Sequence, residues 1–116
     1  MTVEKCYEVM KGDYKDAASR LVTDERIKKF LIKFLSDNSF SQLCTAMEKK
    51  NLEEAFRAAH TLKGISKNLS LTALAYSSSN LTEALREREE YGDDLEELLK
   101  KVKKDYSLTI ACIQML

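Results

Sequence analysis

The chain of 116 residues has the length of a single domain, and its apolar content of 44% is enough for one hydrophobic core. It has no proline and only three glycines, so its composition favours helices over strands. The 19 basic and 19 acidic residues balance to a formal net charge of zero. Nucleic acids and anionic membrane surfaces attract proteins with a basic excess, so we expect neither as a partner.

Other sequence features bear on location and metal binding. No apolar run reaches the roughly 20 residues needed to cross a bilayer, and the first residues lack the basic and then apolar profile of a secretory signal. We therefore expect a cytoplasmic protein. The cysteines at 6, 44 and 112 are odd in number and far apart, which favours reduced thiols, and no spacing fits a metal site.

The first part of the chain predicts short helices. Thr2 can cap a helix over residues 3–10, Gly12 ends it, and Asp13 can cap a second helix reaching Leu21. Thr23 or Asp24 then begins an amphipathic segment that residues 37–39 interrupt, after which Ser39 can start the helix again. Its apolar positions are Ile27, Phe30, Leu31, Phe34 and Leu35, followed by Phe40, Leu43, Cys44 and Met47.

Three more amphipathic helices follow. Asn51, with Glu54 three positions on, resembles a capping box for a helix that runs to about residue 69. Ser70 or Thr72 separates it from the next helix, and the turn at residues 92–93 precedes the last one. We predict an all-α fold: an antiparallel up-down-up-down four-helix bundle with additional short N-terminal helices. The expected organisation is one domain over residues 1–116, with N-terminal helices in 1–22 and the bundle in 23–116.

His60 is the only histidine of the chain. At 100° per residue it lies about 100° from the centre of the apolar stripe of its helix, at the border between core and solvent. Lys63 and Gly64 follow one turn later. Because glycine in a helix interior costs about 1 kcal/mol relative to alanine, Gly64 suggests that a side chain there would obstruct an approaching molecule. These residues indicate an exposed nucleophile with a cation beside it, while no general base, second carboxylate or phosphate-cradling loop accompanies them.

The segment Ala58-Ala59-His60-Thr61-Leu62-Lys63-Gly64 resembles the motif of histidine-containing phosphotransfer (HPt) domains of the bacterial stand-alone type. Further similarity, in residues 12–14, 19–21, 30–34, 68–69 and 81–86, extends the resemblance over roughly residues 10–115. The resemblance implies a phosphorelay carrier with His60 as phosphoacceptor, Lys63 stabilising the phosphoryl oxygens and Gly64 leaving room for a partner. The implied partners are response-regulator receiver domains and a sensor histidine kinase. The receiver would supply Mg²⁺, so we expect no cofactor on this chain and no complete enzyme active site.

Two positions depart from the family pattern. Ser70 stands where many members have glycine, and a left-handed cap there would cost about 1–2 kcal/mol. Thr82 stands where many members have glutamine or glutamate to hold the other ring nitrogen. Thr82 is a candidate for a weaker version of that contact, and Arg57 and Lys67 are candidate cations beside His60, although a solvated surface is the simpler interpretation of Arg57.

Alternatives to this interpretation stay open. The same fold could be an adaptor that binds a signalling partner without transfer, or a fragment of a larger sensor or chemotaxis kinase, although Met1 favours a free-standing protein. The apolar residues 108–116 need a cover. We expect them to pack on the first helix in a monomer, through Val3, Cys6, Tyr7 and Met10, with dimerisation as the alternative.

Overall fold

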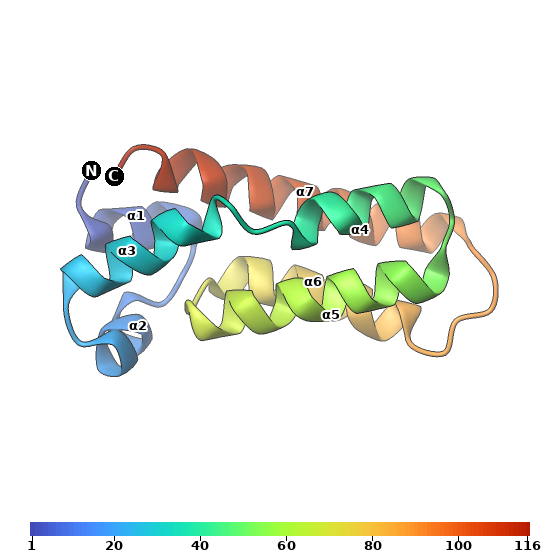
Figure 1. The fold of residues 1–116 in the computed structure, drawn as a ribbon, viewed down its shortest axis with the longest axis horizontal. Coiled ribbons are helices and arrows are strands. Elements are labelled where there is room, and N and C mark those ends of the chain that lie inside the picture. Colours follow the sequence, from blue (N-terminus) through green and yellow to red (C-terminus); the bar gives the residue numbers. More distant parts are fainter.

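The computed structural model describes all 116 residues as a single body of about 44 × 22 × 20 Å. Its secondary structure consists of helices joined by short connections, with no strand (Figure 1). The helices are α1 (Val3–Met10), α2 (Tyr14–Leu21), α3 (Asp24–Phe34), α4 (Ser39–Glu48), α5 (Leu52–Asn68), α6 (Thr72–Leu85) and α7 (Asp93–Ile113). None of them is long and apolar enough to cross a membrane.

Helices α4 to α7 form an antiparallel four-helix bundle, which confirms the predicted fold class. Helix α5 packs between α4 and α6, and α6 packs on α7. Figure 1 shows successive helices running in opposite directions along the long axis, with the two chain ends meeting at one end of the molecule. There the N-terminal ammonium of Met1 donates to the carbonyl of Met115 at 3.2 Å.

Helix α3 precedes α4 but is separated from it by residues 35–38, and it packs chiefly on α1 and α2. Ile27, Leu31 and Phe34 of its predicted stripe are buried, whereas Phe30 and Leu35 each keep 37% of their surface exposed. The predicted stripe was therefore too wide, because a short helix packed on short neighbours covers a narrower sector. Ser39 does not cap α4 as expected; its N–H donates to Oδ2 of Asp37 at 2.9 Å.

Side-chain caps fix the starts of four helices as the sequence predicted. Asn51 Oδ1 accepts from the N–H of Glu54 at 3.1 Å and begins α5. The second half of the predicted capping box is absent, because the Glu54 carboxylate binds Arg57 at 3.2 Å instead. The other three capping residues are Thr2, Asp13 and Thr23.

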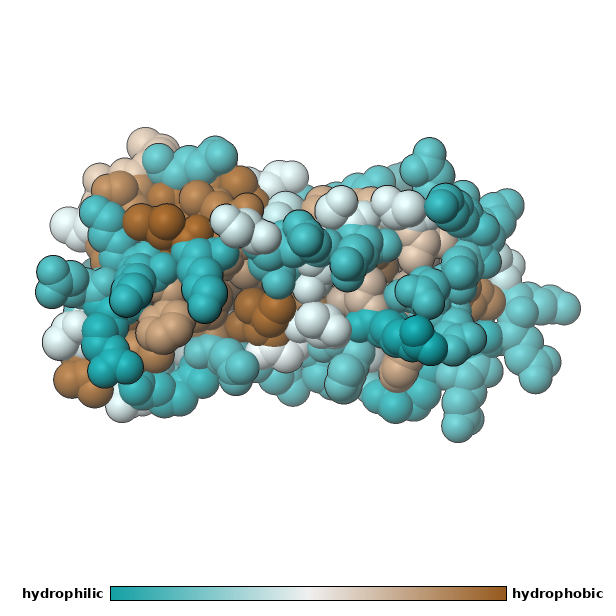
Figure 2. All heavy atoms as spheres, viewed as in Figure 1, coloured by the Kyte–Doolittle hydropathy of each residue, from teal (hydrophilic) through white to brown (hydrophobic).

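The apolar end of α7 is covered by α1, as expected. Cys112 and Ile113 are buried, and the four facing residues of α1, namely Val3, Cys6, Tyr7 and Met10, are buried in the same core. All three cysteines are free. Apolar surface remains at this end: Figure 2 shows apolar side chains gathered toward the end where α1 and α3 lie, with mainly polar side chains toward the other end. The exposed members there include Ile32, Leu35 and Met115.

The turn between α1 and α2 packs against the end of α5. The left-handed residue that ends α1 is Lys11, with φ of 60°, and not the expected Gly12. A Cβ on Gly12 would lie 2.7 Å from the ring of Tyr7 and 2.9 Å from the carbonyl oxygen of Ser70. Glycine is needed here for this close approach, which joins the N-terminal helices to the bundle.

Candidate functional site

Helix α5 places His60 on the surface of the bundle. The inward face of α5 consists of small and medium side chains, and the close packing of α5 with α4 and α6 buries that face. The imidazole of His60 points away from this core and is exposed. The buried residues of α5 are Ala55, Ala58, Ala59, Leu62 and Ser66.

The His60 ring has one aromatic neighbour and no hydrogen-bond partner within the chain. It stacks on the ring of Phe56, one turn earlier, with 6.0 Å between the ring centroids and 15° between the planes. No side chain or backbone group of the chain forms a hydrogen bond with its nitrogens. Both nitrogens are therefore available to an incoming group.

Lys63 and Gly64 lie one turn beyond His60 on the same helix, and both are partly exposed. A Cβ built on Gly64 would meet nothing within 4 Å, and no glycine of the chain has a positive φ. The packing and backbone of this chain therefore do not require glycine at this position. What it provides is bare backbone beside the imidazole.

An ion pair from the end of α6 lies against Phe56, the aromatic ring on which the imidazole stacks. The guanidinium of Arg86 binds the Glu83 carboxylate through two hydrogen bonds of 3.2 and 3.0 Å. The Arg86 Cζ also lies 5.1 Å from the centroid of the Phe56 ring. The hydrogen bond and charge of Arg86 lower the pKa of Glu83, and the positive charge of Lys63 lowers it further.

Sequence reasoning did not find Glu83 and Arg86. The sequence pattern pointed to Thr82 as the partner of the histidine. The next residue, Glu83, carries the carboxylate that belongs to the pair against Phe56. A signal was present in the sequence, because Glu83 and Arg86 are spaced to pair on one helix face. Only the packing of α6 on α5 shows that this pair lies beside Phe56.

Thr82 faces the interior of the bundle. It is fully buried, and its hydroxyl donates to the carbonyl of Ser78 at 2.7 Å. A threonine hydroxyl has one proton to donate, so this bond within α6 uses it. Thr82 makes no hydrogen bond with His60.

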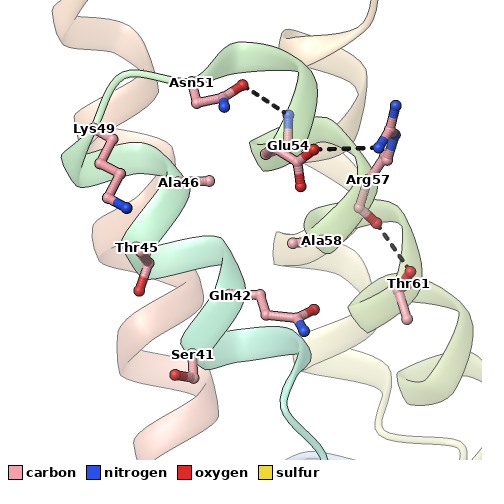
Figure 3. Close-up of a pocket in the computed structure, with 10 residues that line it drawn as sticks. All are labelled: Ser41, Gln42, Thr45, Ala46, Lys49, Asn51, Glu54, Arg57, Ala58 and Thr61. Carbon is pink, nitrogen blue, oxygen red and sulfur yellow. Dashed lines mark hydrogen bonds and ion pairs between the residues drawn. The ribbon is translucent and has the colours of Figure 1, made fainter.

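Arg57 lies in a polar groove between α4 and α5 (Figure 3). Its guanidinium binds Glu53 at 2.6 Å and Glu54 at 3.2 Å, so its charge is already paired with carboxylates of its own helix. The carbonyl of Arg57 accepts from the Thr61 hydroxyl at 2.9 Å, as Figure 3 shows.

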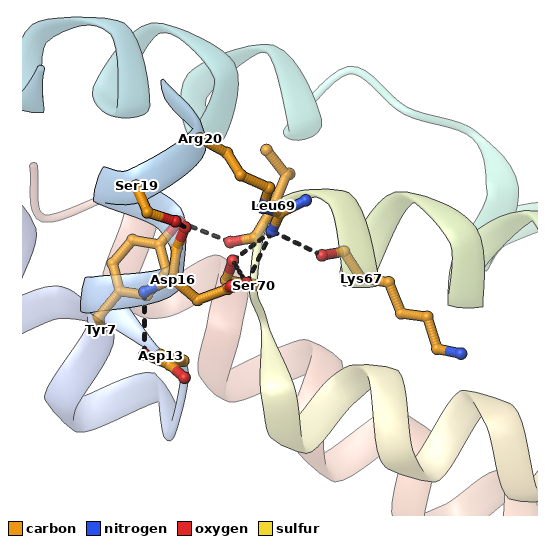
Figure 4. A network of polar contacts seen from close by, with 8 residues as sticks. All are labelled: Tyr7, Asp13, Asp16, Ser19, Arg20, Lys67, Leu69 and Ser70. Carbon is orange, nitrogen blue, oxygen red and sulfur yellow. Dashed lines mark hydrogen bonds and ion pairs between the residues drawn. The ribbon is translucent and has the colours of Figure 1, made fainter. Parts of the chain in front are cut away.

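Lys67 lies near the end of α5, where its carbonyl accepts a hydrogen bond of 3.0 Å from Arg20. Figure 4 shows its side chain extending away from that contact. The two cations proposed beside His60 thus differ, since the charge of Arg57 is paired and the Lys67 side chain is exposed without an ion pair. No group of three or more histidine, cysteine, aspartate or glutamate side chains is placed to hold a metal ion.

Ser70 adopts the left-handed conformation expected for glycine, with φ of 56°. Its hydroxyl donates to Asp16 Oδ2 at 2.6 Å and accepts from Arg20, so α2 holds the end of α5 (Figure 4). The hydrogen bond from Ser70 and the charge of Arg20 lower the pKa of Asp16. The backbone N–H of Asp13 adds a bond of 2.9 Å to the Ser70 carbonyl. These contacts offset the cost of the left-handed serine.

These features define a class of protein. It is a helical bundle that presents a histidine on the surface of the second bundle helix, α5, with lysine and glycine one turn further on. A comparison with family models matches the Hpt domain at residues 34–111, and the chain belongs to this family. The match runs from the end of α3 through most of α7 and includes His60. The similarity noted for residues 12–14, 19–21 and 30–33 lies outside it. No curated protein and no solved structure matched the chain in the corresponding comparisons.

Membership of this family assigns the chain a phosphotransfer-related role in phosphorelay signalling. Hpt domains are phosphocarriers that interact with receiver domains and histidine kinases of two-component systems.

Proposed function

We propose that His60 accepts a phosphoryl group from the aspartyl phosphate of a receiver domain, or from a kinase, and passes it to the aspartate of another receiver. The strongest support is that an exposed imidazole, a lysine and a glycine lie together on one face of α5. The ring is exposed with no hydrogen bond to its nitrogens, and Lys63 and the bare backbone of Gly64 lie one turn away on the same helix. The family match covers all three residues.

The transfer proposed for His60 conserves atoms and charge. The unprotonated nitrogen of the neutral ring, which we assign as Nε2, attacks phosphorus in line with the aspartyl oxygen. The P–O bond breaks with its electron pair returning to the aspartate carboxylate, and an N–P bond forms on a ring that keeps its Nδ1 proton. The reverse reaction passes the phosphoryl group onward. Such transfers depend mainly on positioning and on stabilising the phosphoryl oxygens.

Each neighbouring residue has a distinct part in this proposal. The Lys63 ammonium stabilises the phosphoryl oxygens, and Gly64 lets the receiver approach the imidazole without meeting a side chain. The receiver supplies Mg²⁺ and the acidic pocket, so the chain is a carrier and not a complete enzyme. Lys67, with an exposed and unpaired ammonium, is better placed than Arg57 to add a contact to the partner.

Incubation with a phosphorylated receiver tests the proposal. We expect acid-labile phosphate to appear on the wild-type chain as the receiver loses it, and no labelled chain with His60→Gln. Transfer to the His60→Gln variant would contradict the assignment of the acceptor. Failure of the wild type to take phosphate from any receiver of its organism would contradict transfer itself.

One observation keeps the adaptor hypothesis as a second candidate. Nothing in the chain bonds the ring nitrogens of His60, and Thr82 is turned inward. A domain that only binds a partner has no need to orient its histidine. Isothermal titration with an unphosphorylated receiver separates the two. Tight binding unaffected by His60→Gln, together with no transfer, would favour the adaptor.

We also propose that the chain is a monomer, because α1 covers the apolar face of α7 that would otherwise need a partner. Light scattering at several concentrations tests this, and a mass of twice the 13.3 kDa of one chain would contradict it.

A further inference from the structure

Four side chains from α5 and the end of α6 form a connected group at the candidate site. The His60 ring stacks on Phe56, the Arg86 guanidinium lies over the same Phe56 ring, and Glu83 holds Arg86 through two hydrogen bonds. The pair of Glu83 and Arg86 is not needed to close the core, because their side chains are 58% and 47% exposed. We therefore looked to the function of His60 for the role of this pair.

The charges of this group bear directly on a phosphoryl group carried by His60. Glu83 is linked to the surroundings of His60 through Arg86, which lies over the Phe56 ring on which the imidazole stacks. A carboxylate in that position repels a phosphoryl group, which carries nearly two negative charges, and it also keeps Arg86 occupied. Arg86 opposes this effect, because its positive charge neutralises Glu83.

We propose that Glu83 and Arg86 are positioning residues that set how long a phosphoryl group stays on His60. Glu83 shortens the lifetime of the phosphohistidine and so favours onward transfer, while Arg86, which lies over the Phe56 ring, limits this effect by pairing directly with Glu83. The proposal rests on the proposed function only in taking His60 as the phosphoacceptor.

The expected size of the effect is moderate. Because both side chains are about half exposed, water and salt screen their interaction with the phosphoryl group. A unit charge acting on a doubly charged group through well-screened space changes an equilibrium or a rate by roughly three- to tenfold. The change must shrink at high salt, which a purely structural role of the pair would not require.

The test uses the full chain without a receiver, loaded by phosphoramidate. In this reaction His60 attacks the phosphorus of phosphoramidate, the P–N bond of the donor breaks, and ammonia leaves as the new N–P bond forms. After removal of the donor, loss of phosphohistidine is followed by phosphorus NMR. The variants are Glu83→Gln, Arg86→Gln and the control Glu53→Gln, which removes an exposed carboxylate from a comparable pair with Arg57 on α5.

We expect Glu83→Gln to lengthen the lifetime of the phosphohistidine by roughly three- to tenfold at low salt, and by less at high salt. Arg86→Gln should shorten the lifetime, because it leaves the Glu83 charge unpaired. Glu83→Asp keeps the negative charge and should stay close to the wild type, as should Glu53→Gln. Equal lifetimes in Glu83→Gln and Glu53→Gln, or a longer lifetime in Arg86→Gln, would overturn the proposal.

Two controls distinguish an effect of charge on the phosphohistidine lifetime from unfolding of a variant and from failure of the proposed transfer. Thermal unfolding of each variant shows whether the bundle is intact, and we expect all of them to fold because the substituted side chains are exposed. Failure of the proposed function would appear differently. The loaded protein would still show the dependence of lifetime on Glu83, but it would neither receive phosphate from a receiver nor deliver it to one.

Discussion

Substitution of Gly64 by alanine should make the protein more stable and less active at the same time. The Cβ of alanine would meet nothing within 4 Å, and the position lies inside α5 without a positive φ. The full difference in helix propensity is therefore gained, and we expect the free energy of unfolding to rise by about 1 kcal/mol. Urea unfolding followed by far-ultraviolet circular dichroism measures this change.

The cost of the same substitution should appear in phosphoryl transfer. The added methyl group projects into the open space beside His60 that we assign to the receiver, and a larger side chain there would obstruct it more. We expect Gly64→Ala to slow transfer from a phosphorylated receiver several-fold. Gly64→Gln should slow it at least roughly tenfold, since overpacking at a contact costs about 1–3 kcal/mol. Time courses with radiolabelled phosphate measure both rates.

Ser107→Ala is a matched control, because Ser107 is an exposed position inside α7 on another helix. It should add stability through helix propensity and leave transfer unchanged. Loss of stability in Gly64→Ala would show that the backbone there is not open as described. A normal transfer rate in Gly64→Gln would refute the role of Gly64 in partner access.

Three further predictions concern stability. Ser70→Ala should lower the free energy of unfolding by about 1–3 kcal/mol, because the hydrogen bonds of the hydroxyl are lost. Ser70→Gly should lower it by about 1 kcal/mol less than Ser70→Ala, because glycine relieves the left-handed strain. Equal losses of the two variants in urea unfolding would contradict this. Because the pKa of Asp16 is lowered, its carboxylate should stabilise the fold above about pH 4 and lose this effect as the pH falls further. The difference between wild type and Asp16→Asn should therefore shrink in acid, and a constant difference would argue against the Ser70 contact. Val22 is 72% exposed with φ of 74°, so Val22→Gly should raise the thermal midpoint, and a lower midpoint would mean that this turn is not strained.

The sequence by itself determined the secondary structure and the face of α5 that carries His60. Capping residues such as Thr2, Asp13 and Asn51 act on backbone groups within three residues, so their effect can be predicted without knowledge of the fold. The angular position of His60 follows in the same way from helix geometry and the apolar stripe of one helix. The motif from Ala58 to Gly64 was sufficient to predict the family that the comparison confirms.

Tertiary structure decided every feature that depends on contact between helices. Three features depend on which helices pack together and at what rotation. They are the direction in which Thr82 points, the contacts of α2 with Ser70, and the exposure of Phe30. The charges around His60 are the clearest case. Glu83 and Arg86 are more than twenty residues away along the chain, and only the packing of α6 on α5 brings them to the Phe56 ring. A one-residue difference along α6 turns a side chain by about 100°, which separates the buried Thr82 from the exposed Glu83.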